Sequence, residues 1–225
     1  MRTDVPSIPS VLFSQRVISI QTANRYARLI EENQEDFVDG GCNLPDHWPE
    51  GFDKFNWLQT SVGDELVPAI QASLSELGYS RGFTCGCWAS IYRPGEWIDS
   101  HQHSAHNAPL FITGSLCMKT VTGSKGLALG LDGVGAAWTW LPDNPGQLNL
   151  FTSNLIHATD TNPGPDSRIS LNFDIYPDGI DALNYLIEDP KRYIYYSPEA
   201  SVYSLPEYSL LDSERPPCIP TVSYD

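Results

Sequence analysis

The spacing of apolar residues changes once along this chain, and that change constrains the fold more than any other feature. Before Gly82 the apolar residues recur with the helical period of 3.6, and after it they alternate with a period of two, as in strands. Many short strands joined by Gly, Pro, Asn and Asp predict an antiparallel sandwich or barrel. The expected strands are 84–93, 109–120, 125–131, 136–141, 147–151 and 168–176.

Two amphipathic helices are expected ahead of these strands. Residues 22–38 and 61–77 both carry apolar side chains at helical spacing. Ser61 and Asp64 resemble a capping box for the second helix, and Gly78 suits the position just beyond its end. Both helices are predicted to pack on the outside of the sheet.

The length of 225 residues suits a single domain with a sizeable buried core. We expect a mainly β fold with flanking helices, in which residues 1–82 form helical support and a loop. Residues 83–177 would form a double-stranded β-helix core of the jelly-roll, cupin-like type. Residues 178–225 would form an extension that wraps the core.

Composition limits the partners and the compartment. A net charge of −15 argues against a nucleic-acid backbone or an anionic membrane, because both repel a negative surface. No stretch approaches the ~20 apolar residues that cross a bilayer, and the start of the chain lacks a secretory pattern. We expect a cytoplasmic monomer or homodimer. Five scattered cysteines without a CxxC pair indicate no disulfide framework, and Cys85 and Cys87 are expected to pack as small apolar side chains.

Three of the five histidines lie within residues 101–106. In an extended segment the rings of His101 and His103 project to the same side, which makes a chelating pair for a divalent metal. His157 follows a later β-like run, at whose end it is expected to lie, and a double-stranded β-helix brings two such strands together. These residues predict a facial three-histidine site with open positions. The alternative is that His103 and His106 are surface loop residues and His157 a hydrogen-bonded core residue.

Arg168 and Ser170 open the last predicted strand. Alternation places both side chains on one face, where a guanidinium and a hydroxyl can hold one carboxylate together. A metal site followed by this pair suits a small dicarboxylate, which chelates the metal at one end and meets Arg168 at the other. The alternative is that Arg168 forms a structural salt bridge.

From Trp88 to Asp174 the sequence resembles the small 2-oxoglutarate and Fe(II)-dependent oxygenases of bacteria and phages. Their pattern is an aromatic strand, an H-x-H segment, a Gly-rich sheet, a G-x-L-x-x-F…L-x-H strand and an R-I-S-x-x-F strand. The matching residues here are Trp88, Tyr92, Gly95, His101, His103, Thr113-Gly114-Ser115, Gly146-Gln147-Leu148, Phe151, Leu155-Ile156-His157, Asn162 and Arg168-Ile-Ser170-Leu-Asn172-Phe173.

The resemblance implies an oxygenase that uses Fe(II), 2-oxoglutarate and O2 to hydroxylate a small molecule or a peptidyl residue, with release of succinate and CO2. The three histidines would bind the iron. Arg168, helped by Ser170 and Tyr92, would hold the distal carboxylate of 2-oxoglutarate. Trp88, His106 and Asn172 are candidate substrate contacts.

One departure from the wider superfamily concerns the metal ligands. That superfamily uses His-x-Asp or His-x-Glu, whereas this chain has His101-x-His103. Asp99 could serve in reversed order, but His103 is the preferred ligand. Three neutral ligands leave the iron one charge more positive.

Two other kinds of protein fit the same residues. The first is a cupin-like three-histidine metalloenzyme, a dioxygenase or isomerase, that does not use 2-oxoglutarate. The second is a non-enzymatic β-sandwich module with an incidental metal site.

Overall fold

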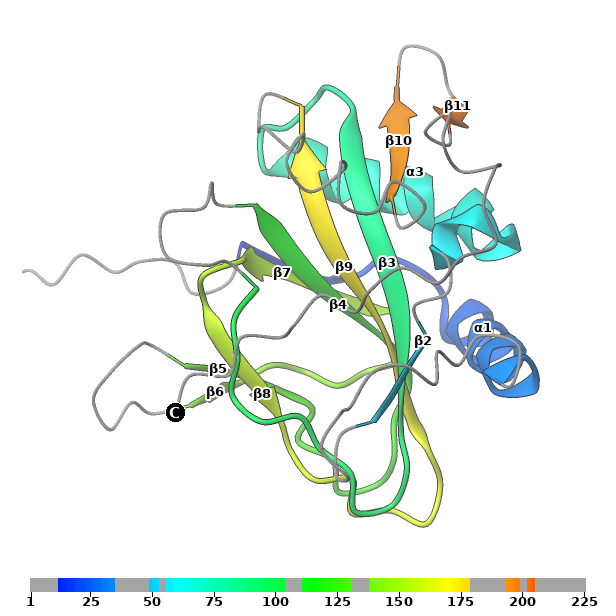
Figure 1. Cartoon of the computed structure of the whole chain (residues 1–225), viewed down its shortest axis with the longest axis vertical. Coiled ribbons are helices and arrows are strands. Elements are labelled where there is room, and N and C mark those ends of the chain that lie inside the picture. Colours follow the sequence, from blue (N-terminus) through cyan, green and yellow to red (C-terminus); the bar gives the residue numbers. More distant parts are fainter. Residues whose placement is uncertain are drawn as a thin grey trace, which may run out of the picture.

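The computed structural model describes residues 12–34, 49–52, 56–103, 111–130, 138–178, 193–198 and 202–204. Within these ranges, two antiparallel sheets lie beside two helices (Figure 1). The helices are α1 (Ile20–Glu32) and α3 (Ser61–Glu76), and a short 3-10 helix, η1 (Trp57–Gln59), precedes α3. The strands are β1 (Phe13–Arg16), β2 (Glu50–Phe52), β3 (Phe83–Tyr92), β4 (Ile112–Lys119), β5 (Leu127–Gly130), β6 (Thr139–Trp140), β7 (Gln147–Thr152), β8 (Ile156–Thr159), β9 (Arg168–Pro177), β10 (Tyr193–Ser197) and β11 (Val202–Ser204).

The sheets form the two halves of a jelly-roll. The larger sheet has the order β1-β7-β4-β9-β3-β10-β11, and β2 also pairs with β3. The smaller sheet has the order β6-β5-β8. Residues from both sheets meet in a small apolar cluster, made of Leu127, Leu129, Leu141, Phe151 and Leu155. The expected fold class, mainly β with a jelly-roll core and outer helices, is confirmed.

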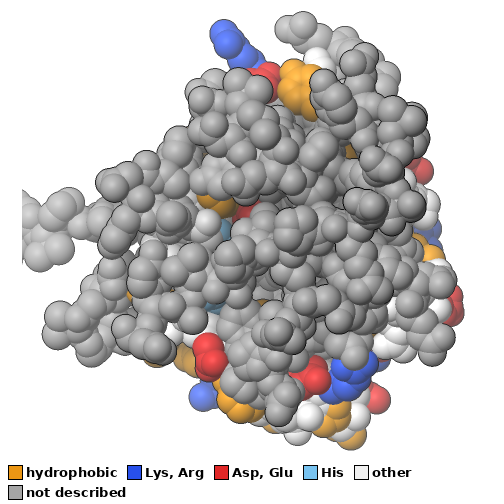
Figure 2. Space-filling view, viewed as in Figure 1, with side chains coloured by type: hydrophobic (Ala, Val, Ile, Leu, Met, Phe, Trp, Pro, Cys, Tyr) orange, Lys and Arg blue, Asp and Glu red, His pale blue; other side chains and the backbone are white. Residues whose placement is uncertain are grey.

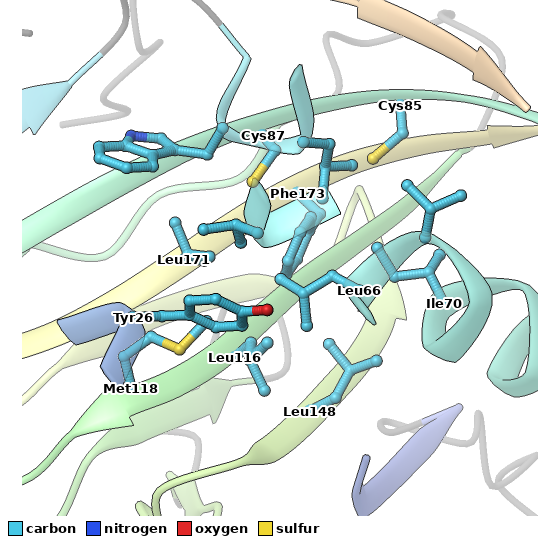
Figure 3. Packing of buried hydrophobic residues seen from close by; sticks show 14 of the residues in the cluster. Tyr26, Leu66, Ile70, Cys85, Cys87, Leu116, Met118, Leu148, Leu171 and Phe173 are labelled. Atoms are coloured by element: carbon cyan, nitrogen blue, oxygen red, sulfur yellow. The ribbon is translucent and has the colours of Figure 1, made fainter. Parts of the chain in front are cut away.

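Strand β9 lies in the middle of the larger sheet and has two chemically different faces. Leu171 and Phe173 are fully buried on the face that packs against the helices. Figure 3 shows Tyr26 of α1 and Leu66 and Ile70 of α3 among the side chains of this layer. The opposite face of β9 turns towards the smaller sheet and carries polar residues. The helices therefore complete the core on one side and leave the other side of the sheet for a site.

The helix ends follow from local hydrogen bonds. The backbone N–H of Val62 donates to the Thr60 hydroxyl at 3.2 Å, so the cap of α3 is Thr60 and the predicted capping box at Ser61 is wrong by one residue. Gly78 has φ 92° just beyond the helix, where a residue without a side chain adopts the left-handed conformation at no steric cost. Its predicted place is confirmed.

The first helix differs in its bounds. It begins at Ile20 because Ser19 caps it, and it ends at Glu32 with Asn33 as the C-cap. Residues 35–38 of the predicted helix lie outside the described residues.

Several strands differ from the prediction. A turn follows β7, so His157 lies near the start of β8 and not at the end of a continuous run. The pairing of β1 with β7 was not expected from sequence. Strands β10 and β11 belong to the 178–225 region, and β10 pairs with β3. Cys85 and Cys87 are buried free thiols, as expected.

Removing a large side chain from the helix-facing side of β9 will destabilise the fold. Leu171 is fully buried, and Leu171→Ala is expected to lower the free energy of unfolding by about 2–5 kcal/mol through lost burial and the cavity left behind. The matched control is Ile20→Ala at a 42% exposed position, with an expected change below about 0.5 kcal/mol. Urea unfolding measures both. Equal losses would contradict the assignment of the core.

Candidate metal centre and adjoining pocket

Two of the predicted metal ligands face each other across an antiparallel bridge. The backbone N–H of His101 donates to the His157 carbonyl at 2.9 Å, and the His157 N–H donates back at the same distance. Two residues paired in this way project their side chains to one face of a sheet. The ring centroids lie 4.2 Å apart. The bridge thus joins residues that are far apart in sequence.

His103 completes the group from the same extended segment. Its backbone N–H donates to the Ser153 carbonyl at 2.9 Å, which fixes the chain beside the turn that precedes β8. Its ring centroid lies 5.3 Å from that of His101 and 4.9 Å from that of His157. One ligand atom of each of the three residues lies within 4.8 Å of the other two. Figure 2 shows histidine surface, in pale blue, near the middle of this face.

Hydrogen bonds orient all three rings. The Nδ1 atoms of His101 and His157 lie 2.9 and 3.0 Å from the carbonyl oxygens of Asp99 and Leu155. A carbonyl only accepts, so these Nδ1 atoms carry the proton and Nε2 keeps its lone pair. The Nδ1 atom of His103 is held by the Asp174 carboxylate at 2.7 Å. Nε2 is therefore the atom through which each ring would bind a metal.

Burial keeps two of these rings neutral. Burial, with the neighbouring His103 as the second cause, lowers the pKa of His101 to about 4. Burial, followed by the charges of His101 and His103, also lowers the pKa of His157 well below its ordinary value. Neutral imidazole is the form that binds a metal, and it suits Zn, Cu, Fe and Ni. The three-nitrogen set with open positions therefore fits an iron ion.

Asp99 takes a different role from the one considered for it. Its carbonyl orients His101, and its side chain accepts a hydrogen bond from Trp97 Nε1 at 2.9 Å. Among the described residues, the group that could hold a metal comprises the three histidines and not Asp99.

The polar face of β9 begins at the three histidines, where Asp174 contacts His103, and continues along the strand to Arg168. Alternation along the strand puts Arg168, Ser170, Asn172 and Asp174 on one face, with Asp174 at the histidine end. The facing residue on β3 is Tyr92 for Arg168, and the guanidinium carbon lies 4.2 Å from the centre of the Tyr92 ring. A single strand therefore runs from the three histidines to a buried arginine.

Arg168 is held on one side and open on the other. Its Nη1 donates to Asp160 Oδ1 at 2.6 Å and to the Ser124 hydroxyl at 3.0 Å. The structural salt bridge considered from sequence is thus present. Its Nη2 is buried and has no hydrogen-bond partner among the described residues. A buried donor left unpaired costs free energy of about 1–3 kcal/mol, so this atom calls for an acceptor.

A small pocket that opens to solvent lies at this end of the sheet. Its lining includes Tyr92, Ser115, Asn149, Thr159, Arg168 and Ser170. Thr159 follows His157 by two residues on β8, which places the two side chains on the same face, about 6.6 Å apart along the strand. The pocket therefore reaches to within two residues of His157 along β8.

The loop that contains Lys125 and Gly126 fixes Asp160, the carboxylate that pairs with Arg168. The Asp160 carboxylate accepts hydrogen bonds from the backbone N–H groups of Lys125 and Gly126 at 2.6 and 3.0 Å. Gly126 has φ 81°, and a Cβ there would lie 2.5 Å from Asp143 Cβ, so only glycine fits. Asp160 is thereby fixed before it contacts Arg168.

Two of the candidate substrate contacts, Trp88 and Asn172, pair with each other across β3 and β9. Asn172 donates to the Ser90 hydroxyl at 3.0 Å and accepts from the Ser170 hydroxyl at 3.3 Å. The Trp88 ring lies 5.7 Å from that of His103, on the histidine side of the sheet. His106 lies outside the described residues.

Sequence reasoning missed Asp160, Ser124 and Asp174. The two contacts of Arg168 come from other segments of the chain, and no local pattern indicates them. Asp174 could have been found, because it continues the alternation of Arg168 and Ser170 on the same strand.

Comparisons with known proteins establish the fold. No protein-family model and no curated protein matches the sequence. Among solved structures, a prolyl-4-hydroxylase from Pseudomonas putida is similar, with a TM-score of 0.54 and 15% identity over 74% of this chain and 92% of that one. The carbocyclase SnoK from nogalamycin biosynthesis, described as non-haem and alpha-ketoglutarate-dependent, has a TM-score of 0.59 and 11% identity over 78% and 85%.

The epimerase SnoN, solved in complex with Fe3+, alpha-ketoglutarate and nogalamycin RO, has a TM-score of 0.58 and 11% identity over 72% of this chain and 76% of that one. The chain thus has the jelly-roll fold of these three enzymes. In the part of the chain that is described, no helix has the length and apolar character to cross a membrane.

The lowered pKa of His101 predicts how the stability of the metal-free protein changes with pH. Between the ordinary value of 6.5 and about 4, the unfolded chain takes up a proton at this residue that the folded protein does not. The free energy of unfolding therefore has its full value above pH 6.5, and His101 lowers it by up to about 3 kcal/mol as the pH falls towards 4. Urea unfolding of wild type and His101→Gln isolates this contribution. The same pH dependence in both proteins would contradict the burial of a neutral ring.

Proposed function

We propose that this protein is a non-haem Fe(II)/2-oxoglutarate-dependent oxygenase that hydroxylates a small molecule or a peptidyl residue. The three Nε2 atoms of His101, His103 and His157 would hold the iron. Two observations support this proposal independently of each other. The fold is shared with SnoN, solved with alpha-ketoglutarate, and with the alpha-ketoglutarate-dependent SnoK. In the adjoining pocket, one arginine nitrogen has no partner within the described part of the chain.

The observation that carries the proposal is the hydrogen bonding of the Arg168 guanidinium, in which Nη1 is paired and Nη2 has no partner among the described residues. Asp160 and Ser124 occupy Nη1 and fix the plane of the guanidinium. Nη2 remains as a buried donor in a pocket next to the histidines. A carboxylate that accepts from a guanidinium forms a strong, oriented bond. A dicarboxylate such as 2-oxoglutarate could satisfy this donor while its other end reaches the metal.

Iron(II) with 2-oxoglutarate and O2 supplies an oxidant for C–H bonds as the cosubstrate is decarboxylated to succinate and CO2. The chain's own residues would bind and orient the reactants. Arg168 would hold the distal carboxylate, and the Ser170 hydroxyl would turn from Asn172 Oδ1 to donate a second hydrogen bond to it. Tyr92 would keep the guanidinium in place through its ring face, 4.2 Å away.

The substrate would bind at the histidine end of the polar face of β9. Trp88 lies beside His103 and would form an apolar wall there, and Asn172 presents an amide on the same sheet face. His106 remains a proposed substrate contact on sequence grounds. The net charge of −15 favours a neutral or cationic substrate over a polyanion.

The three-histidine ligand group favours one second candidate. A cupin-like metalloenzyme that binds its own substrate directly, without 2-oxoglutarate, would use the same three nitrogen atoms. It gives no role to the unpaired Nη2 of Arg168, and for this reason it ranks second.

Anaerobic titration of the Fe(II)-loaded protein with 2-oxoglutarate distinguishes these functions. The oxygenase is expected to develop a saturable metal-to-ligand charge-transfer band. In Arg168→Ala, the loss of a charge-assisted hydrogen bond worth about 1.5–3 kcal/mol is expected to weaken 2-oxoglutarate binding at least about tenfold. Bound iron without any band in the wild type would favour the second candidate.

Two variants control this titration. Arg16→Ala removes an exposed arginine and is expected to bind 2-oxoglutarate as the wild type does. Arg168→Ala leaves Asp160 buried without its cation, so the double variant with Asp160→Asn removes that penalty. Normal 2-oxoglutarate binding by the folded double variant would contradict the role of Arg168.

A further inference from the structure

One of the three histidines differs from the others in the charge of its partner. His101 and His157 are oriented by neutral carbonyl groups, whereas His103 is oriented by a carboxylate, Asp174, at 2.7 Å. Both side chains are largely buried, with exposures of 12% for His103 and 16% for Asp174. A carboxylate this close to a ligand ring acts electrostatically on whatever the ring binds.

The position of His103 is where the wider superfamily carries a carboxylate ligand, so the substitution raises the charge of the centre. Three neutral imidazoles leave a divalent ion with both of its positive charges. Asp174 adds one negative charge next to the His103 ring, to which it is hydrogen-bonded. The ion, the three rings and Asp174 together then carry one positive charge, as they would with a carboxylate ligand.

We infer that Asp174 is a positioning residue that supplies from outside the ligand group the negative charge that the His101-x-His103 pattern lacks inside it. This inference takes the identity of the metal, iron, from the proposed function. The hydrogen bond between Asp174 and His103 Nδ1 fixes the orientation of the His103 ring and increases the basicity of Nε2, as carboxylates do beside metal-bound histidines. The Thr113 hydroxyl donates a long hydrogen bond of 3.5 Å to the same oxygen, and because it is neutral it leaves the carboxylate its charge.

The location of Asp174 on β9 strengthens the inference. It shares its face with Arg168, so one strand would supply both the group that holds the cosubstrate and the group that tunes the metal. Because β9 pairs with β3 on one side and β4 on the other, the carboxylate has little freedom to move. This is the rigid support that a metal site requires.

Metal affinity in the absence of 2-oxoglutarate tests the inference. Co(II) is titrated anaerobically against a competing chelator in wild type, Asp174→Asn and Asp166→Asn. Asparagine keeps an acceptor for Nδ1 but removes the charge, and we expect affinity to fall about 10–100-fold. Asp166→Asn makes the same change at an exposed position and is expected to leave affinity within about twofold of wild type. Equal affinity of Asp174→Asn and wild type would overturn the inference.

A second variant separates charge from a packing defect. In the double variant His103→Asp/Asp174→Asn, the carboxylate moves from the outer position into the ligand group, and Co(II) affinity is expected to recover above that of Asp174→Asn. In the iron-loaded protein, Asp174→Asn is expected to shift the Fe(III)/Fe(II) potential to a more positive value, because Fe(III) loses more attraction than Fe(II). Absence of both effects would show that Asp174 has only a structural role. Failure of 2-oxoglutarate binding would leave these metal measurements unaffected.

Discussion

The alternation of side chains along β9 is the constraint on which the rest of the structure depends. Its apolar residues face α1 and α3 and form the centre of the main core, and its polar residues face the smaller sheet. A strand in the middle of a sheet cannot rotate or slip by one residue without exchanging the two sets. The burial of Leu171 and Phe173 therefore also fixes the direction of Arg168 and Asp174.

The backbone bridge between His101 and His157 supplies the second fixed element. It attaches an irregular segment to the smaller sheet, opposite the polar face of β9. The three rings are then oriented by hydrogen bonds at Nδ1, and burial keeps two of them neutral. These hydrogen bonds restrict the three side chains, which lowers the conformational entropy that metal binding would cost.

The sequence predicted the elements whose signals are local and repeated. The change of period at Gly82, the turns at Gly and Pro, and the spacing of the three histidines led to the fold class and to the ligand group. The register between segments was not predictable, and so Asp160 and Ser124 beside Arg168 were missed. The cap at Thr60 shows the same limit on a smaller scale, since Thr60 and Ser61 both suit the position and the wrong one was chosen.

The proposed function requires one molecule of 2-oxoglutarate to contact both the pocket lined by Arg168 and a metal on the three histidines. The most direct test is an anaerobic crystal structure of the protein with Mn(II), as a redox-stable substitute for Fe(II), and 2-oxoglutarate. The proposal predicts the metal on Nε2 of His101, His103 and His157, with the distal carboxylate of 2-oxoglutarate bound by Nη2 of Arg168. A metal on these histidines with 2-oxoglutarate absent from the pocket, or bound away from Arg168, would contradict it.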